Sequence, residues 1–303
     1  MTKLYLITGF LGAGKTTFLN KFTQLFQDKK IVLIVNEFGK NGVDGALLQH
    51  IGARLAEIDN GSIFCACRIE QFEEAVTTML EYRPDYIFVE ASGLADPTAV
   101  RSIFSQDIYS QLEYAGAICI VDAVRFHKVY ETARVCRMQL AISDLVLINK
   151  TDIASKDQIE EIKQIVKAQK PGRAIYETTY GEFDKAWLDT INADEPGDED
   201  IQIHTRDISL QKKSITVKGF DISSLTSFLK MVAEDTYRIK GFVEIDGNTY
   251  LVDCVGPLVE VHPFEGQPVN PGVLTVLYGH GLSAVKSIKE ARTWFANATV
   301  EII

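Results

Sequence analysis

The first 180 residues alternate short apolar runs with longer amphipathic stretches, and this alternation limits the folds open to the chain. The runs are rich in Ile, Val and Leu and do not alternate strictly with polar residues, as expected of strands covered on both faces. They are Leu4–Thr8, Ile31–Asn36, Tyr86–Glu90, Ala117–Val121, Leu145–Ile148 and Ala174–Tyr176. The stretches between them predict helices over 15–27, 69–82, 98–106, 125–133 and 155–168. Strands that alternate with helices in this way predict a doubly wound, mainly parallel α/β sheet.

The pattern changes after residue 180. Acidic residues around Pro196-Gly197 predict a solvated linker over 181–208. The remaining residues, 209–303, predict helices at 222–236 and 283–296. Strands are predicted at 214–220, 239–245, 249–255, 258–262, 273–278 and 298–303. We therefore expect an α/β domain over 1–180 and a second, smaller α+β domain after the linker.

Charge and cysteine content narrow the classes of partner. The chain has 31 basic and 41 acidic residues, a net charge of −10, which disfavours non-specific binding to nucleic acid or anionic membranes. No apolar run approaches the roughly 20 residues of a membrane span. The start of the sequence lacks the pattern of an export signal, and five cysteines do not form a disulfide framework, so we predict a cytoplasmic location. Three cysteines lie in apolar contexts and are expected to be packing residues: Cys119, Cys136 and Cys254.

A glycine-rich motif follows the first predicted strand and opens the first predicted helix. Residues 9–16, Gly-Phe-Leu-Gly-Ala-Gly-Lys-Thr, fit the pattern G-x-x-x-x-G-K-[ST], and we call them the phosphate loop. Its glycines let successive backbone N–H groups turn toward a polyphosphate, Lys15 would neutralise the β- and γ-phosphates, and the Thr16 hydroxyl would bind Mg²⁺. The residues expected at the phosphates are Gly9, Gly12, Ala13, Gly14, Lys15, Thr16 and Thr17.

A second motif indicates which base is bound. The residues Asn149-Lys150-Thr151-Asp152 directly follow the apolar run that ends at Ile148. A carboxylate at this position can accept the N1–H and N2–H₂ donors that guanine has and adenine lacks, and such a site can reject the wrong base by about 10⁴-fold. We therefore predict GTP or GDP as the nucleotide, with Asn149, Lys150 and Asp152 in its site.

Two further segments end predicted strands where a nucleotide pocket is expected, because ligands bind at the carboxyl ends of strands in open α/β sheets. Glu37 ends one of them and Glu90 the other. Glu90 is placed to hold Mg²⁺ through water, and Gly93 to offer a backbone N–H to the γ-phosphate. Glu37, Asp44 or Glu90 could position the attacking water, and the sequence does not rank them. The expected catalytic residues are Lys15, Thr16, Glu37 and Glu90.

These motifs resemble the CobW/HypB/UreG family of GTPases, and specifically its CobW-like branch. The resemblance covers nearly the whole chain, through Thr8–Thr17, Asn36–Gly39, Gly42–Gly45, Asn60-Gly61, Glu90–Pro97, Val121–Ala123, Asn149–Asp152 and Arg238–Phe242. It implies a GTPase that uses its nucleotide state to deliver a metal ion, or a metal cofactor of the cobalamin type, to a client protein. It also implies a nucleotide-dependent homodimer.

The chain departs from the family at its cysteine motif. CobW-like proteins usually carry C-x-C-C after Asn-Gly, whereas here Ser62 and Phe64 replace two of the three cysteines. Cys65 remains, and Cys67 is a replacement two residues later, so this pair is the candidate site for Zn²⁺, Co²⁺ or Ni²⁺. Two thiolates need further ligands to hold zinc. Lys40 stands where relatives tend to have a glutamate, which lowers the affinity for a divalent cation.

Two functions of different class follow from these residues. The first is a Mg²⁺-dependent GTPase of low intrinsic turnover that acts as a metallochaperone-like switch, in which Lys15 and Mg²⁺ stabilise charge on the transferred phosphoryl group. The second is a GTP-gated binding protein for a cofactor enzyme that carries no metal itself. The motif at 149–152 disfavours a third possibility, an ATP-dependent kinase.

Overall fold

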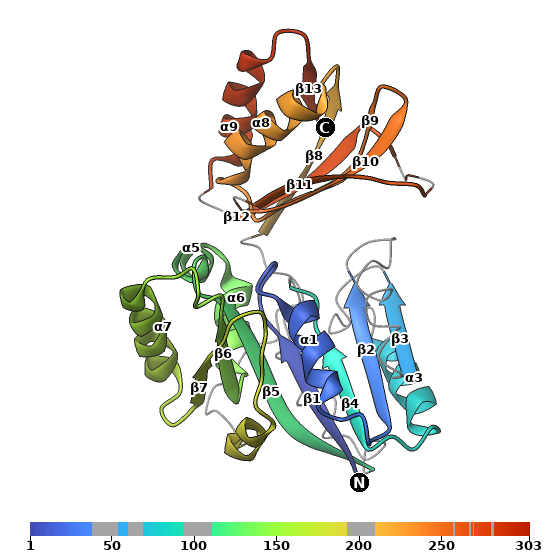
Figure 1. Cartoon of the computed structure of the whole chain (residues 1–303), viewed down its shortest axis with the longest axis vertical. Helices are drawn as coiled ribbons and strands as arrows, with labels where there is room; N and C mark the ends of the chain where they lie inside the picture. The colour runs from blue at the N-terminus through green and yellow to red at the C-terminus, as the bar shows by residue number, and fades with distance from the viewer. Residues whose placement is uncertain are drawn as a thin grey trace. The chain divides into compact units, whose positions relative to one another are not determined.

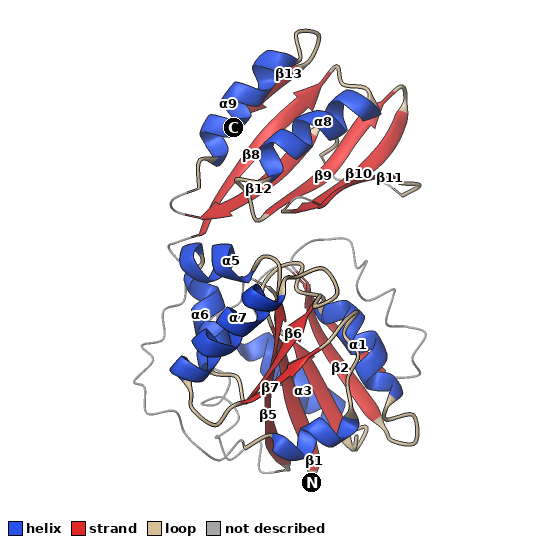
Figure 2. Cartoon of the chain, turned by 60° about the vertical axis from the view of Figure 1, so that its left-hand side comes forward, coloured by secondary structure: helices blue, strands red, loops and turns tan. Residues whose placement is uncertain are grey.

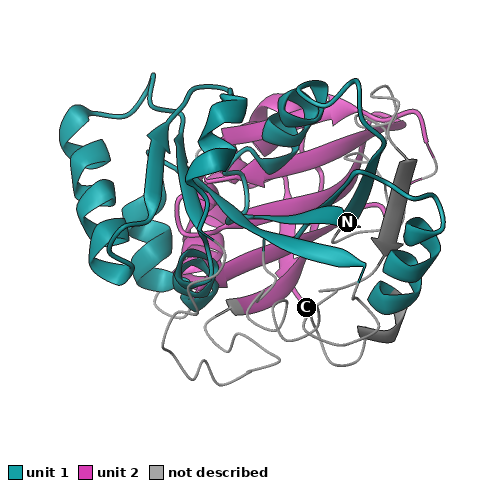
Figure 3. Cartoon of the chain, turned by 90° about the horizontal axis from the view of Figure 1, so that it is seen from below, with its two compact units in different colours: residues 1–207 teal, residues 208–303 magenta. Residues whose placement is uncertain are grey.

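The chain divides into two compact units, Met1–Asp207 and Ile208–Ile303 (Figure 3). The structure is a computed structural model, and it describes residues 1–37, 54–59, 69–93, 111–192, 210–256, 258–266, 268, 270–279 and 282–303. Within these residues no helix is long and apolar enough to cross a membrane.

Unit 1 is built around a seven-stranded sheet in which all strands are parallel (Figure 1). Its order is β3-β2-β4-β1-β5-β6-β7. The strands are β1 (Thr2–Thr8), β2 (Ile31–Glu37), β3 (Arg54–Asp59), β4 (Tyr86–Glu90), β5 (Leu112–Asp122), β6 (Leu145–Asn149) and β7 (Ala174–Glu177). The described helices are α1 (Lys15–Gln24), α3 (Ile69–Leu80), α5 (Phe126–Thr132), α6 (Arg134–Ala141), α7 (Lys156–Gln169) and the 3₁₀ helix η3 (Lys185–Thr190). The predicted doubly wound α/β fold is confirmed.

Apolar residues on both faces of the strands explain why the sheet is buried. In β1, Leu4 and Leu6 face one core, where α3 contributes Phe72 and Val76. The intervening Tyr5 and Ile7 face a second core, where α1 contributes Phe18, Leu19 and Phe22 and the turn after it contributes Phe26. Because helices cover both faces, the strands need apolar side chains at successive positions, which is the pattern of the sequence.

Three elements of unit 1 were not among those predicted from the sequence: β3, α6 and the short η3. Within the described residues, β3 lies at an edge of the sheet and pairs with β2, and its sequence includes the charged residues Arg54 and Glu57. Helix α6 begins directly after Ala133, whose backbone is extended. No glycine or proline separates α6 from α5, so the sequence does not mark the boundary between the two helices. The helix predicted over 98–106 lies outside the described residues.

The prediction that the linker begins at residue 181 is wrong for its first part. Phe183, Trp187, Leu188 and Ile191 pack against the core beneath α1. The Trp187 ring stacks on Tyr176 of β7, with ring centroids 4.2 Å apart and an interplanar angle of 5°. Aromatic side chains within an otherwise acidic stretch hold it on unit 1 through residue 191. The acidic residues 193–209 lie outside the described residues.

Unit 2 has a six-stranded sheet in the order β11-β10-β9-β12-β8-β13, and its paired strands are all antiparallel. Two helices pack on it, and their apolar faces share one core with the sheet (Figure 2). The strands are β8 (Leu210–Lys218), β9 (Arg238–Ile245), β10 (Asn248–Val255), β11 (Leu258–Pro263), β12 (Val273–Gly279) and β13 (Thr299–Ile302). The helices are α8 (Ile222–Ala233), α9 (Ala284–Ala291) and the short η4 (Arg292–Trp294). This agrees with the predicted smaller α+β fold.

Candidate functional site

The phosphate loop connects the end of β1 to the start of α1. Lys15 is 8% exposed, and its Nζ donates hydrogen bonds to the carbonyl oxygens of Gly9, at 2.9 Å, and Phe10, at 3.4 Å. Gly14 caps α1 with a left-handed backbone, φ 99°. The lysine ammonium therefore lies over the loop's own backbone, at the positive end of a helix.

Thr16 and Thr17 follow on the first turn of α1. The Thr16 side chain is half-buried and that of Thr17 is exposed. Solvent exposure also varies along the phosphate loop: Ala13 is buried and Gly12 is exposed.

Asn149, at the end of β6, is joined to the phosphate loop. Its side chain is buried; Nδ2 donates to the carbonyl oxygen of Ala13 at 2.9 Å, and Oδ1 accepts from the backbone N–H of Gly181 at 3.1 Å. A Cβ added to Gly14 would lie 2.5 Å from Asn149 Nδ2, so the close approach requires glycine there. This amide connects three segments that are far apart in sequence.

The next residue, Lys150, contacts the neighbouring carbonyl of the loop. Its Nζ donates to the Gly12 carbonyl oxygen at 2.8 Å and to Asp122 Oδ2 at 2.6 Å. Its backbone is left-handed, φ 65°, an uncommon conformation for a residue with a side chain. Successive residues of the predicted base motif thus hold successive carbonyl groups of the phosphate loop.

Asp152 is exposed beside the segment that follows β7. The backbone N–H and the hydroxyl of Thr151 both donate to the carbonyl oxygen of Thr178, at 3.2 and 2.9 Å. Residues 178–181 therefore border the predicted base motif. The sequence analysis assigned these residues no role. The feature of the sequence that could have pointed to them is Gly181, a glycine shortly after the last strand of the parallel sheet.

Glu90 and Gly93 lie on the other side of the loop. Glu90 ends β4, is buried, and aligns with Ile7 of β1, two residues before the loop. A Cβ added to Gly93 would lie 2.8 Å from the backbone nitrogen of Leu11, so residue 93 abuts the phosphate loop. The strand order brings these predicted residues together at the carboxyl ends of β1 and β4.

The remaining predicted residues cannot be placed as side chains. Glu37 ends β2, whose backbone alone is described there, while Asp44, Cys65 and Cys67 lie outside the described residues. Among the residues that the structure does describe, no group of three or more His, Cys, Asp or Glu side chains is arranged to hold a metal ion.

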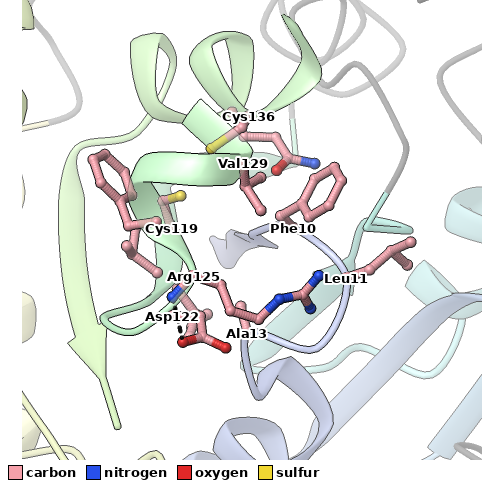
Figure 4. Close-up of a pocket in the computed structure, with 12 residues that line it drawn as sticks. Phe10, Leu11, Ala13, Cys119, Asp122, Arg125, Val129 and Cys136 are labelled. Carbon is pink, nitrogen blue, oxygen red and sulfur yellow. Dashed lines mark hydrogen bonds between the residues drawn. The ribbon is translucent and has the colours of Figure 1, made fainter. Parts of the chain in front are cut away.

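A pocket of about 320 Å³, partly open to solvent, lies behind the phosphate loop (Figure 4). Phe10, Leu11 and Val129 line it together with the thiols of Cys119 and Cys136. Burial raises the pKa of Cys119 to about 12 and raises the pKa of Cys136 further. Both side chains are buried in this apolar lining and belong to no cluster of metal-ligating groups among the described residues, as expected of packing residues. Cys254 is likewise buried, in the core of unit 2.

Comparison with known proteins identifies the family. The CobW/HypB/UreG nucleotide-binding domain matches residues 3–177. The zinc chaperone CobW of a Sinorhizobium species is 29% identical over 84% of this chain and 85% of its own length. The zinc chaperone YjiA of Escherichia coli is 30% identical over 80% of this chain and 81% of its own. The zinc-regulated GTPase metalloprotein activator 1 of Schizosaccharomyces pombe is 25% identical over 87% of this chain and 77% of its own.

The matched region spans all of the parallel sheet, from β1 to the end of β7. It includes the phosphate loop, the strand ends at Glu90 and Asn149, and the contacts between them. The chain therefore belongs to the CobW/HypB/UreG family and is a P-loop GTPase.

Proposed function

We propose that GTP binds across the phosphate loop and the 149–152 motif. The observation that carries this proposal is the pair of hydrogen bonds from Asn149 and Lys150 to the carbonyl groups of Ala13 and Gly12. These contacts make the predicted phosphate and base segments one site. In this site the Asp152 carboxylate selects guanine, because it accepts the two donors that adenine lacks.

We propose that hydrolysis uses Lys15, Thr16 and one of the strand-end carboxylates. Thr16 and Glu90 supply oxygen atoms, which Mg²⁺ prefers, so the side chains fit this ion, with Glu90 acting through water. When bound, Mg²⁺ neutralises charge on the phosphates. The Lys15 ammonium would exchange the Gly9 and Phe10 carbonyl oxygens for phosphate oxygens, and Gly93 would donate its N–H to the γ-phosphate. Glu37, Asp44 and Glu90 remain the candidates to orient the attacking water.

We propose that the nucleotide state controls delivery of zinc to a client metalloprotein. The names of the two bacterial relatives, zinc chaperones, support zinc over cobalt or nickel, and that of the yeast relative supports activation of a metalloprotein. Cys65 and Cys67 would be ligands, with the remaining ligands from elsewhere in the chain or from a second copy in a nucleotide-dependent dimer. Unit 2 would contact the client, in the cytoplasm. Delivery of a cobalamin-type cofactor is the alternative cargo.

The first test is nucleotide turnover. Lys15→Ala should abolish GTP hydrolysis and weaken GDP binding, because the variant loses the ammonium proposed to contact the β- and γ-phosphates. Lys21→Ala is the matched control, since Lys21 lies on the same helix and its exposed side chain pairs with Glu182 at 3.3 Å. GDP should raise the melting temperature of the wild-type protein, and ADP should not. Equal stabilisation by ADP would refute the guanine assignment.

The second test is zinc binding with GDP and with a GTP analogue. We expect binding tighter than about micromolar in one nucleotide state, and its loss in Cys65→Ser and Cys67→Ser. The replacement of two family cysteines by Ser62 and Phe64 favours a second candidate function, a GTP-gated binding protein without metal. No zinc binding in either state, together with a client complex that a chelator does not disturb, would support this second function.

A further inference from the structure

Asp122 contacts Lys150, the residue that holds the Gly12 carbonyl of the phosphate loop. It is the last residue of β5, is 8% exposed, and aligns with Asn149 at the end of β6. Its two carboxylate oxygens have separate partners. Oδ2 accepts from the Lys150 ammonium at 2.6 Å, and Oδ1 accepts from the backbone N–H of Val124 at 3.0 Å. Oδ1 also accepts from the backbone N–H of Arg125, at 3.2 Å (Figure 4).

Oδ1 and its two N–H donors fix the orientation of the carboxylate. An aspartate that accepts hydrogen bonds from the backbone two and three residues ahead closes a tight turn, so its side chain has little rotational freedom. The second oxygen is then held at the position of the Lys150 ammonium. Charge-assisted hydrogen bonds of this kind are short and about twice as strong as neutral ones.

Lys150 connects the fixed carboxylate of Asp122 to the Gly12 carbonyl of the phosphate loop. Lys150 is half-exposed and its side chain has many rotamers, so it would not by itself hold the Gly12 carbonyl. With Asp122 in place, the ammonium is fixed between the carboxylate and that carbonyl oxygen. Gly12 is exposed and, as a glycine, has wide backbone freedom, so the contact restricts this part of the loop.

We propose that Asp122 is a positioning residue for the nucleotide: it clamps Lys150 onto the Gly12 carbonyl and so holds the phosphate loop in its binding shape before GTP or GDP arrives. The proposal rests on the nucleotide site proposed above. A loop that is already ordered loses less conformational entropy on binding, so the clamp increases affinity without touching the nucleotide. The clamp also links the 149–152 motif to the phosphate loop, so a substitution that displaces one segment also displaces the other.

The variant Asp122→Asn isolates the clamp from the turn. Asparagine retains an oxygen that can accept from Val124 and Arg125, but it presents either a neutral oxygen or an N–H₂ group to the lysine ammonium. We expect GDP to dissociate about tenfold faster than from the wild-type protein, measured by displacement of a fluorescent GDP. Asp122→Ala loses the turn as well and should be at least as fast.

A second buried ion pair of the same unit supplies the matched control. Asp144, directly before β6, accepts Lys170 Nζ at 3.1 Å and the backbone N–H of Ala117 at 2.8 Å. It lies just before the start of β6, beside Ala117 in the middle of β5, whereas Asp122 lies at the end of β5. Asp144→Asn removes a similar pair and should lower the melting temperature while leaving the GDP dissociation rate unchanged.

A double-mutant cycle separates a clamp from general destabilisation. If Asp122 acts through Lys150, then Asp122→Asn combined with Lys150→Met should release GDP no faster than Lys150→Met alone. Should Asp122→Asn fail to fold, Lys150→Met breaks the same contact from its half-exposed side and must itself speed release about tenfold. Rates within twofold of wild type, additive effects, or equal acceleration by Asp144→Asn would each overturn the proposal. A wild-type protein that does not bind GDP at all would refute the proposed function instead.

Discussion

Residue 93 is a glycine because the backbone of the phosphate loop occupies the space that a Cβ would need. A Cβ at this position would lie 2.8 Å from the Leu11 nitrogen and 3.0 Å from the Leu11 Cα, and both atoms belong to the backbone of the phosphate loop. Backbone atoms cannot rotate away from a collision, so the loop itself would have to move.

Gly93→Ala should therefore weaken GDP binding by about tenfold or more, since the displaced loop no longer fits the phosphates. Isothermal titration with GDP measures this. The control is Gly172→Ala: φ at Gly172 is +83°, so alanine costs about 1 kcal/mol of stability, but no atom lies within 4 Å of the added Cβ. If the Gly172 variant lost as much affinity as the Gly93 variant, unfolding rather than loop displacement would explain both.

Burial of thiols gives a second expectation at this scale. Desolvation raises the pKa of Cys119 and of Cys254 to about 12, so their reactive thiolates are nearly absent at pH 8. Mass analysis after iodoacetamide treatment should find both residues unmodified in the folded protein and modified in guanidinium chloride. Because each folded-state pKa is raised, its contribution to stability is fully present below the unfolded thiol's pKa near 9 and is lost progressively as the pH rises toward 12, where protection from labelling should also fail. Rapid labelling of the folded protein at pH 8 would contradict their assignment to the core.

Side chains proposed to bind the nucleotide directly were easier to predict than those that support the phosphate loop. Lys15 and Asp152 fall in motifs whose spacing specifies a chemical role. Asn149 and Lys150 donate to backbone carbonyls of a segment more than a hundred residues away, and Asp122 acts on that segment through Lys150. No local pattern encodes which carbonyl is reached; these contacts follow from the strand order, which sets β5 beside β1 and β6 beside β5.

At the scale of elements, the short helix η3 shows how tertiary contacts override composition. Residues 181–192 are polar enough to predict a linker, yet Trp187 stacks on Tyr176 and its edge meets Phe183 at 5.1 Å. Phe183 in turn contacts Phe18 and Phe22 of α1. The segment thus covers the helix that begins at the phosphate loop.

Trp187→Ala should lower the free energy of unfolding of unit 1 by about 2 kcal/mol, through lost burial and lost ring stacking. Urea unfolding followed by circular dichroism measures the change. Trp294→Ala is the matched control, because Trp294 is 77% exposed and its removal should change stability by less than about 0.5 kcal/mol. Equal effects of the two substitutions would show that η3 does not support unit 1.

The other differences between prediction and structure also occur where local signals are weak. Within the described residues, β3 lies at an edge of the sheet, where charged residues such as Arg54 and Glu57 are common and weaken the apolar pattern of a strand. In unit 2 every predicted strand and helix has a counterpart, with ends that differ by a few residues. Clear turn residues, such as Asp246-Gly247, separate its strands, and β9, β10 and β11 are neighbours both in sequence and in the sheet. The strands β8, β12 and β13 pair with strands that are distant in sequence.

At the scale of the whole molecule, the units have separate cores, and the proposed nucleotide site lies in unit 1. The core of unit 2 is built from its own sheet and from α8 and α9. A ligand that binds one cooperative unit stabilises that unit alone, by an amount set by its concentration relative to Kd. The slowest-exchanging amides of each unit report its own unfolding.

Hydrogen exchange with and without GDP should therefore separate the units. At a GDP concentration of about 100 times Kd, the slowest amides of β5 and β6 should exchange about 100-fold more slowly, since exchange then requires release of the ligand. The amides of β9 and β12 should be unchanged. ADP at the same concentration serves as the control for non-specific effects. Equal protection of β9 and β12 by GDP would mean that unit 2 unfolds together with unit 1. In that case, nucleotide binding and release would directly change the stability of unit 2, the proposed client-binding unit.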